Sequence, residues 1–248
     1  MSYVNILGIK IDKVSKKQAL KKVDEFLISN KQNKIFTPNP EMLVDARKDE
    51  YFREVLNSGD LNICDGFGIT LVTRGKLKRI PGVDFMLDVC KLAEEKGKSV
   101  YLLGSESDEV VKKTAEVLQE KFSLLKIVGY GRGSELANLP TCQLDYDKDK
   151  NEDVLYDIIT TSPDILFVAF GHGKQEKWIE ENLVDLPSVK VVMGVGGSFD
   201  FISGKTKRAP VFIRKIGFEW FYRLLREPKR LGRIFKATFK FLYLYVKR

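Results

Sequence analysis

Short apolar runs rich in β-branched residues alternate along the chain with amphipathic segments. The runs are typical of strands, and most of the segments between them repeat apolar positions with a helical period. The predicted strands are 5–11, 34–36, 61–64, 99–103, 125–128, 164–170 and 189–193. The predicted helices are 15–28, 41–57, 85–96, 108–122, 151–160 and 175–183. Strands that alternate with helices indicate βαβ units, so we expect an α/β fold with a mainly parallel, Rossmann-like sheet flanked by helices.

Nearly every predicted strand is followed by a cluster of small or polar residues. Ligands bind beyond the carboxyl ends of the strands in open parallel α/β sheets, where such loops converge. The chain therefore predicts one composite site built from six clusters. They are Thr37-Pro38-Asn39-Pro40, Asp65-Gly66-Phe67-Gly68, Gly104-Ser105-Glu106, Gly129 to Gly133, Gly171 to Glu176, and Gly194 to Gly197.

Two of the glycine clusters partly match a dinucleotide-binding fingerprint. Neither Gly129-x-Gly131-x-Gly133 nor Gly194-x-Gly196-Gly197 completes the G-x-G-x-x-G spacing. This disfavours a nucleotide-dependent oxidoreductase, and we expect no cofactor. The second cluster still lies between a strand and a helical pattern. Its amides near Gly196 and Gly197 either approach a diphosphate or form a plain tight turn.

Asp65 directly follows an apolar run, at the mouth of the predicted sheet. Partial desolvation there raises the pKa of a carboxyl group toward that of a useful general base. Aspartate also favours the N-cap of a helix, and the pattern alone supports both roles equally. Thr37 and Asn39 can likewise contact a ligand or cap a helix, and we expect one of the two to cap. The same two roles are open to Gln175 and Glu176.

The composition argues against several kinds of metal and thiol chemistry. With one histidine in the chain, a His-based metal site or a Ser/His/Asp triad would rest on His172 alone. The three cysteines, Cys64, Cys90 and Cys142, have unrelated spacings that indicate reduced, structural thiols. Asp145-Tyr146-Asp147 matches a metal-binding Asp-x-Asp pattern, but its flanking lysines favour a solvated charge cluster. We therefore expect no metal.

Positive charge is concentrated at the C-terminal end. Residues 204–248 carry fourteen Lys or Arg against two Glu, a net charge of about +12, and the whole chain carries +8. The first 203 residues are therefore about −4. We predict an α/β domain over 1–203 and a basic helical appendage over 204–248. A basic, aromatic-rich end indicates a polyanionic partner, either membrane phosphates or nucleic acid.

Helical phasing separates the outer part of this tail into two faces. At 100° per residue the basic residues fall within about 60° of one another, opposite an apolar group. This pattern is typical of a helix lying in an anionic membrane interface and disfavours nucleic acid, whose binding needs basic and exposed aromatic residues on one surface. The alternative is a helix that packs its apolar face on the body. The basic residues are Lys229, Arg233, Lys236, Lys240 and Lys247; the apolar ones are Leu231, Ile234, Phe235, Phe241, Leu242 and Tyr245.

The chain shows neither a secretory signal nor an apolar stretch near the roughly 20 residues that span a bilayer. We therefore expect a cytoplasmic protein that associates peripherally with the inner face of the cell membrane.

Several of these segments occur together and in a fixed order. They are Thr37 to Glu41, Asp65 to Gly68, Arg79 to Asp84, Lys174 to Trp178, Gly194 to Asp200, Gly204 to Pro210, Glu219-Trp220, Tyr222 to Leu224 and Glu227 to Arg230. In this order they resemble the WecG/TagA/CpsF family of bacterial glycosyltransferases, and specifically its TagA branch of wall teichoic acid synthesis. One departure is Gly173, where the family pattern has a proline.

The resemblance implies an inverting transferase that moves N-acetylmannosamine from UDP to the 4-hydroxyl of N-acetylglucosamine on undecaprenyl diphosphate, giving a β-1,4-linked lipid disaccharide. It favours Asp65 as the base. The positions that the resemblance assigns to substrate binding are Thr37, Asn39, Arg79, Gln175, Glu176, Gly196 and Gly197. Some of the tail arginines Arg208, Arg214, Arg223 and Arg226 are expected to close over the site and contact a diphosphate.

Overall fold

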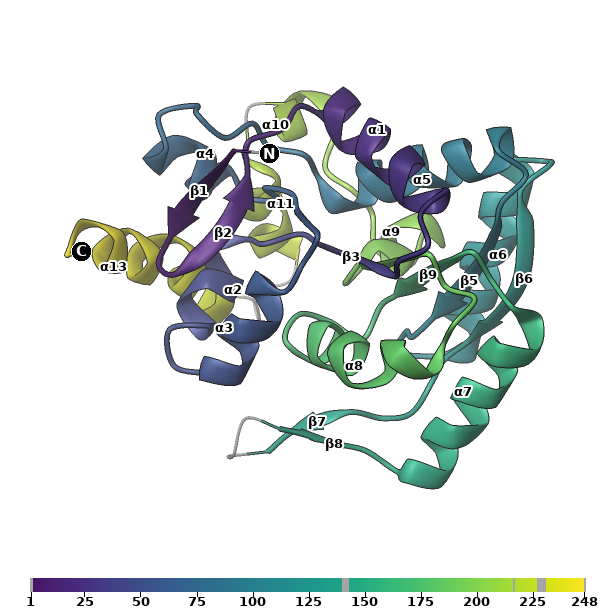
Figure 1. Cartoon of the computed structure of the whole chain (residues 1–248). Helices are drawn as coiled ribbons and strands as arrows, with labels where there is room; N and C mark the ends of the chain where they lie inside the picture. The colour runs from purple at the N-terminus through teal and green to yellow at the C-terminus, as the bar shows by residue number, and fades with distance from the viewer. Residues whose placement is uncertain (1, 140–142, 216, 227–230, 248) are drawn as a thin grey trace.

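Six parallel strands form the central sheet, in the order β4-β3-β10-β9-β5-β6 (Figure 1). They are β3 (Asn33–Phe36), β4 (Leu61–Asn62), β5 (Ser99–Leu103), β6 (Lys126–Gly131), β9 (Ile165–Val168) and β10 (Val191–Gly194). The structure, a computed structural model, describes residues 2–139, 143–215, 217–226 and 231–247. The predicted α/β fold with a mainly parallel sheet is confirmed.

Alternate residues of the strands pack into two cores, one on each face of the sheet. On β5, Val100 and Leu102 face one core, and Tyr101 and Leu103 face the other, because successive side chains of a strand point to opposite faces. The first core is covered by α1 (Lys16–Leu27), α5 (Gly82–Glu95), α6 (Asp108–Lys121) and α9 (Ser198–Ile202). The second is covered by α2 (Pro40–Asp45), α3 (Glu50–Asn57), α7 (Lys148–Thr161) and α8 (Lys174–Asn182).

Two predicted elements are each divided by a turn. The run 5–11 is not one strand of the main sheet: β1 (Tyr3–Ile6) and β2 (Ile9–Asp12) form a separate antiparallel hairpin. Leu7 and Gly8 make its turn with φ of 51° and 89°, which is the backbone of a two-residue hairpin loop. The predicted helix 41–57 is divided into α2 and α3 because Asp49 caps α3, accepting a hydrogen bond from Phe52 N at 2.8 Å.

Smaller elements complete the body. The short helix α4 (Phe67–Val72) follows Asp65, and the 3₁₀ helix η1 (Leu183–Asp185) follows α8. The strands β7 (Ala137–Asn138) and β8 (Leu144–Asp145) pair as an antiparallel hairpin. β8 is followed closely by α7, which begins at Lys148. Asp147 caps α7 by accepting a hydrogen bond from Lys150 N at 3.2 Å, so one carboxylate of the Asp-x-Asp pattern has a capping role.

The C-terminal tail consists of short helices that return to the body. They are α10 (Val211–Lys215), α11 (Glu219–Arg226), α12 (Leu231–Phe235), the π-helical stretch η3 (Lys236–Lys240) and α13 (Phe241–Val246). The last helix packs beside α2 (Figure 1) and also contacts α4. Phe241 is 0% exposed and belongs to the core that contains Phe36 and Met42. Within the described ranges, the helices are all too short or too polar to cross a bilayer.

Candidate active site

The carboxyl ends of the strands surround a polar cavity of about 610 Å³. All six predicted clusters contribute to its wall, through residues such as Thr37, Asp65, Ser105, Arg132 and Gly171. The β10–α9 loop adds Gly196 and Gly197. The parallel sheet therefore brings these clusters together as the strand pattern predicts.

A second cavity, of about 440 Å³, lies between the body and the C-terminal tail. Its wall is largely apolar: Phe67 and Leu71 come from α4, and Trp220, Phe241 and Leu242 come from the tail. We call it the apolar cavity. Asp65, Asn39 and Gly82 line both this cavity and the polar one. Asp65 therefore lies where the two cavities meet.

The Asp65 carboxylate binds the start of α5 and does not cap the helix that follows it. Its Oδ2 atom accepts a hydrogen bond from Gly82 N at 3.1 Å, and its Oδ1 atom lies 3.8 Å from Arg79 Nε. The N-cap of α4 is Gly66. The side chain is 28% exposed. Burial raises the pKa of Asp65 above its usual value, although Arg79 and the Gly82 amide partly oppose this shift.

Close backbone packing fixes the loop that carries Asp65. Asp65 N donates to Pro38 O at 3.1 Å, and Ile80 N donates to Cys64 O at 2.8 Å. A Cβ atom at Gly66 would lie only 2.5 Å from Pro40 Cδ, so this position requires glycine. Cys64 is buried, which raises the pKa of its thiol to about 11. This agrees with a structural thiol rather than a nucleophile.

A cluster of half-buried arginines and acids lies beside Asp65. Glu219 on α11 lies between two guanidinium groups: Oε2 is 3.0 Å from Arg79 Nη2, and Oε1 is 3.6 Å from Arg208 Nε. Arg208 also pairs with Asp84 at 2.6 Å, and Arg214 lies 3.7 Å from the same carboxylate. Desolvation would raise the pKa of Asp84, but hydrogen bonds and charge from Arg208 lower it overall.

The arginines that we expected to bind substrate therefore do not all have the same position relative to the cavities. Arg79 and Arg208 line the apolar cavity, and Arg214 donates to Ala209 O at 3.0 Å. Arg223 and Arg226 lie on α11, but their side chains are outside the described part of the structure. Glu219 was not predicted as a partner of these arginines. The available signal was its charge, since it is one of two acids in the strongly basic tail.

Gln175 and Glu176 connect two loops of the polar cavity. Gln175 Oε1 accepts a hydrogen bond from Gly196 N at 2.8 Å, and Gln175 Nε2 donates to Glu176 Oε1 at 2.7 Å. Glu176 is fully buried and also accepts from Gly173 N at 2.6 Å. Burial raises the pKa of Glu176. Gln175 lines the cavity, whereas Glu176 acts on it through Gln175 and caps α8.

The amides near Gly196 and Gly197 were left with two roles, contact with a diphosphate or a plain tight turn. In this arrangement the Gly196 N–H donates to Gln175, so a diphosphate would have to replace that hydrogen bond to bind it. The departure at Gly173 also has a structural basis. Gly173 has a φ of 82°, and the ring of proline holds φ near −65°. A proline at this position therefore requires a different loop conformation.

Asn39 and Thr37 divide the two roles left open between them. Asn39 Oδ1 accepts hydrogen bonds from Glu41 N at 3.0 Å and Met42 N at 3.1 Å, so this side chain caps α2. Thr37 is buried to 8% exposure and lines the polar cavity. Asn39 also contributes to the walls of both cavities, so capping does not remove it from the site.

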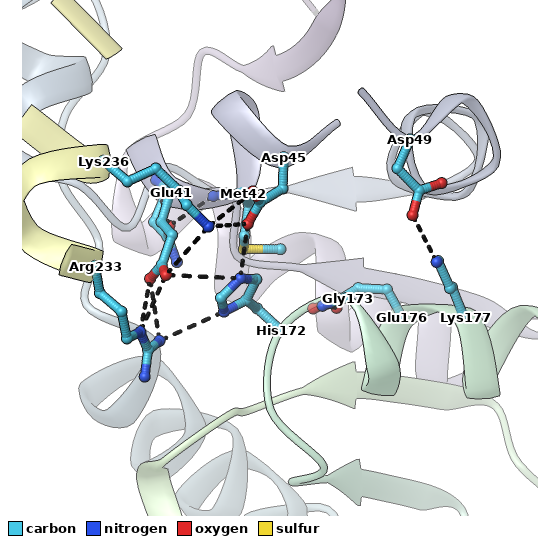
Figure 2. A network of polar contacts seen from close by, with 11 residues as sticks. Glu41, Met42, Asp45, Asp49, His172, Gly173, Glu176, Lys177, Arg233 and Lys236 are labelled. Atoms are coloured by element: carbon cyan, nitrogen blue, oxygen red, sulfur yellow. Dashed lines mark hydrogen bonds and ion pairs between the residues drawn. The ribbon is translucent and has the colours of Figure 1, made fainter. Parts of the chain in front are cut away.

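A polar network joins the tail to α2 and to the loop before α8 (Figure 2). Arg233 Nε lies 3.0 Å from Glu41 Oε1, and Lys236 Nζ lies 2.9 Å from Asp45 Oδ1. His172 contacts both sides, with Nε2 3.2 Å from Asp45 Oδ2 and Nδ1 3.5 Å from an Arg233 nitrogen. Desolvation raises the pKa of Asp45, but hydrogen bonds from His172 and Lys236 lower it overall.

The network corrects the expected membrane-facing stripe. Arg233 and Lys236 point toward the body and bind carboxylates there. Lys247 contacts the hydroxyl of Tyr243 at 3.2 Å and is exposed. Lys240 is half-buried, and Lys229 lies outside the described residues.

The tail nevertheless presents an apolar row to solvent. Phe235 and Phe239 are 59% and 67% exposed, and their rings stack with centroids 5.4 Å apart. Leu231 and Leu242 extend this row. Phe241 points the other way, into the core. The tail therefore packs on the body through Phe241 and through the basic residues Arg233 and Lys236, and it leaves other apolar side chains exposed.

A group of side chains able to act as metal ligands, not predicted from the sequence, is formed by Glu41, Asp45 and His172. Their ligand atoms lie within 4.8 Å of one another. In this arrangement the two carboxylates are already neutralised by Arg233 and Lys236. A cation would have to displace these side chains.

Comparison with known proteins agrees with this geometry. The family model described as glycosyl transferase WecG/TagA/CpsF family matches residues 4–248. An N-acetylglucosaminyldiphosphoundecaprenol N-acetyl-beta-D-mannosaminyltransferase of Staphylococcus aureus strain MW2 is 32% identical over 251 residues, which cover 98% of this chain and 92% of the relative. The proteins of the same name from strains NCTC 8325 / PS 47 and COL have the same identity and coverage. The chain thus belongs to the WecG/TagA/CpsF family of glycosyltransferases.

Proposed function

We propose that this protein transfers N-acetylmannosamine from UDP-N-acetylmannosamine to the 4-hydroxyl of N-acetylglucosamine carried on undecaprenyl diphosphate. The observation that carries the proposal is the position of Asp65, between a polar and an apolar cavity. A nucleotide sugar requires a polar site, and a lipid-linked acceptor requires an apolar one. The staphylococcal relatives are named for a transfer of this kind, which supports the same substrates here.

In this proposal Asp65 is the general base. Its carboxylate takes the proton of the acceptor hydroxyl while that oxygen attacks the anomeric carbon. The bond from that carbon to the UDP oxygen breaks on the opposite face, and the electron pair leaves with UDP. The configuration inverts and a β-1,4 linkage forms. A raised pKa suits this role because it makes Asp65 a stronger base than an ordinary surface aspartate.

Other groups position the substrates or meet the charge on UDP. Thr37 and Gln175 line the polar cavity and can hold the donor sugar, and such positioning lowers the barrier substantially. Lys174 and Arg132 line the same cavity and would meet the charge on the departing diphosphate, Arg132 after leaving its ion pair with Glu135. Arg79 and Arg208 line the apolar cavity, beside the expected diphosphate of the acceptor.

We further propose that the protein acts at the inner face of the cell membrane. The apolar row of Leu231, Phe235, Phe239 and Leu242 is exposed on a tail with a net charge of about +12. Apolar area with surrounding positive charge favours a peripheral position on an anionic leaflet. The apolar cavity opens beside this tail, so a lipid acceptor could enter it from the membrane.

A donor screen tests the proposal. The purified full chain is incubated with an acceptor carrying N-acetylglucosamine diphosphate on a short polyprenyl chain, and with UDP-N-acetylmannosamine, UDP-N-acetylglucosamine or UDP-glucose. We expect a disaccharide lipid with the first donor, and a β linkage by NMR. Transfer from another UDP-sugar alone would refute the assigned donor. Retention of configuration would refute the single-displacement mechanism.

A further inference from the structure

Among the side chains that the structure describes, the cluster beside Asp65 is balanced in charge, although it borders a cavity suited to an anion. Three cations, Arg79, Arg208 and Arg214, lie among the acids Asp65, Asp84 and Glu219. Asp65 and Asp84 come from the body, and Glu219 comes from the tail. Glu219 is only 12% exposed and lies between the two arginines that line the apolar cavity. Without its charge, the cluster would carry a net positive charge facing that cavity.

Two of the guanidinium donors have no acceptor among the described residues. The Nε atoms of Arg79 and Arg208 are both buried, and within the described part of the chain neither donates a hydrogen bond. Each lies close to a carboxylate, at 3.8 Å from Asp65 and 3.6 Å from Glu219, but too far for a hydrogen bond. One carboxylate therefore does not satisfy the two guanidinium groups.

A diphosphate would complete this site better than Glu219 does. Each phosphate group offers several acceptor oxygens, and guanidinium groups bind such oxygens through two donors at once. The unsatisfied Nε of Arg208 lies beside Glu219 and that of Arg79 lies beside Asp65. Two open donors on neighbouring guanidinium groups point to an anion with more acceptors than a carboxylate has. The neighbouring apolar wall, with Phe67, Trp220 and Phe241, suits the hydrocarbon chain of a lipid diphosphate.

We propose that Glu219 occupies the place of a ligand diphosphate between Arg79 and Arg208, and that this diphosphate displaces it on binding. The assignment of the diphosphate to a lipid acceptor rests on the proposed function. The anion site itself does not, because it follows from the two arginines and their unsatisfied donors. Glu219 thus keeps the arginines paired while the site is empty and competes with the ligand for them.

The test compares the unmodified chain with Glu219→Gln, which removes the charge and keeps the shape. Inorganic pyrophosphate is titrated into each full-length protein in a calorimeter. We expect about tenfold tighter binding by Glu219→Gln, since a like charge a few ångströms from the anion is removed. Glu116→Gln is the matched control. It removes one negative charge from an exposed i,i+3 pair with Lys113 on α6, and should leave pyrophosphate affinity unchanged.

Unchanged or weaker binding by Glu219→Gln would overturn the proposal, because it would mean that Glu219 merely orients the arginines. A second measurement needs no change at Glu219. Trp220 is its neighbour on α11 and is 39% exposed, whereas Trp178, the other tryptophan, is buried. Pyrophosphate should therefore change the tryptophan emission of the unmodified chain, and Trp220→Phe should abolish that change. Constant emission at saturating pyrophosphate would also count against displacement.

Two kinetic arms identify the source of the diphosphate. If it belongs to the acceptor, Glu219→Gln lowers the KM for the lipid acceptor about tenfold and leaves inhibition by UDP unchanged. If it belongs to the nucleotide, UDP inhibits about tenfold more strongly and the acceptor KM stays the same. If the protein transfers none of the sugars tested, the proposed function fails, but the pyrophosphate titrations still decide the role of Glu219.

Discussion

Replacing Asp65 by asparagine separates catalysis from folding at the centre of the site. The substitution removes one charge and the proton acceptor but keeps an oxygen that can accept the hydrogen bond from Gly82 N, now 3.1 Å away. The backbone hydrogen bonds of this loop, Asp65 N to Pro38 O and Ile80 N to Cys64 O, join main-chain atoms, so the substitution does not affect them. We therefore expect the loop to keep its conformation.

The expected changes in rate and in stability have opposite signs. Loss of a general base costs roughly 10²- to 10⁴-fold in kcat, or about 3–5 kcal/mol in the barrier. Stability follows from the pKa, which burial raises in the folded protein. A raised pKa means that the ionised carboxylate destabilises the folded state at neutral pH. Neutral asparagine removes this cost, and each kcal/mol gained would raise Tm by about 2–4 °C in a chain of this size.

Two measurements on the same preparations test this reasoning. Initial rates of disaccharide formation are followed at saturating donor and acceptor, and thermal unfolding is followed by circular dichroism at neutral pH. Asp24→Asn is the matched control. Asp24 is an exposed aspartate on α1 that pairs with Lys96 at 2.9 Å, and its replacement should change neither quantity appreciably.

The combined result is decisive. Near-normal turnover by Asp65→Asn would remove Asp65 as the base. A markedly lower Tm would show that the carboxylate stabilises the fold, which contradicts a desolvated base held at a cost to stability. Only a large loss of rate with an equal or higher Tm agrees with the structure.

Three further predictions concern the pH profile, the tail and metal ions. The acidic limb of kcat/KM should lie above 3.8, the usual pKa of an aspartic acid, because the base must be ionised and its pKa is raised; a limb at or below that value would contradict the desolvation of Asp65. Phe241→Ala should destabilise the protein by about 3–5 kcal/mol in chemical denaturation, whereas the exposed Phe239→Ala should change stability by no more than about 0.5 kcal/mol. Activity should persist in excess EDTA; loss that magnesium restores would instead point to Glu41, Asp45 and His172 as metal ligands.

Much of the site was predictable because its residues follow strands. The carboxyl ends of parallel strands meet at one edge, so Thr37, Asp65 and Gly196 could be placed together from the strand pattern alone. The role of Asp65 was not decided by that pattern. That role depends on contacts with Gly82 and Arg79. The segment that carries these two residues returns to the end of the strand, and no local sequence signal predicts that return.

The tail shows why helical phasing was insufficient. Phasing identifies the residues that share a face, but it does not tell whether that face meets solvent or the body. Arg233 and Lys236 meet carboxylates of α2, which lies almost 200 residues earlier in the chain. The five residues of η3 are also π-helical, so they turn less than 100° per residue, and Lys240 and Lys247 lose their phase with Arg233.

The insertion of Phe241 into the core has a consequence for the order in which the protein folds. Its ring packs near Gly68 and Pro40, next to the loop that carries Asp65. Because Phe241 lies far downstream of both residues in the sequence, this contact closes a long loop of chain. The Asp65 loop therefore acquires its final packing only after the tail has docked on the body. Chains truncated before Phe241 should lack this packing, so they should not form a complete site.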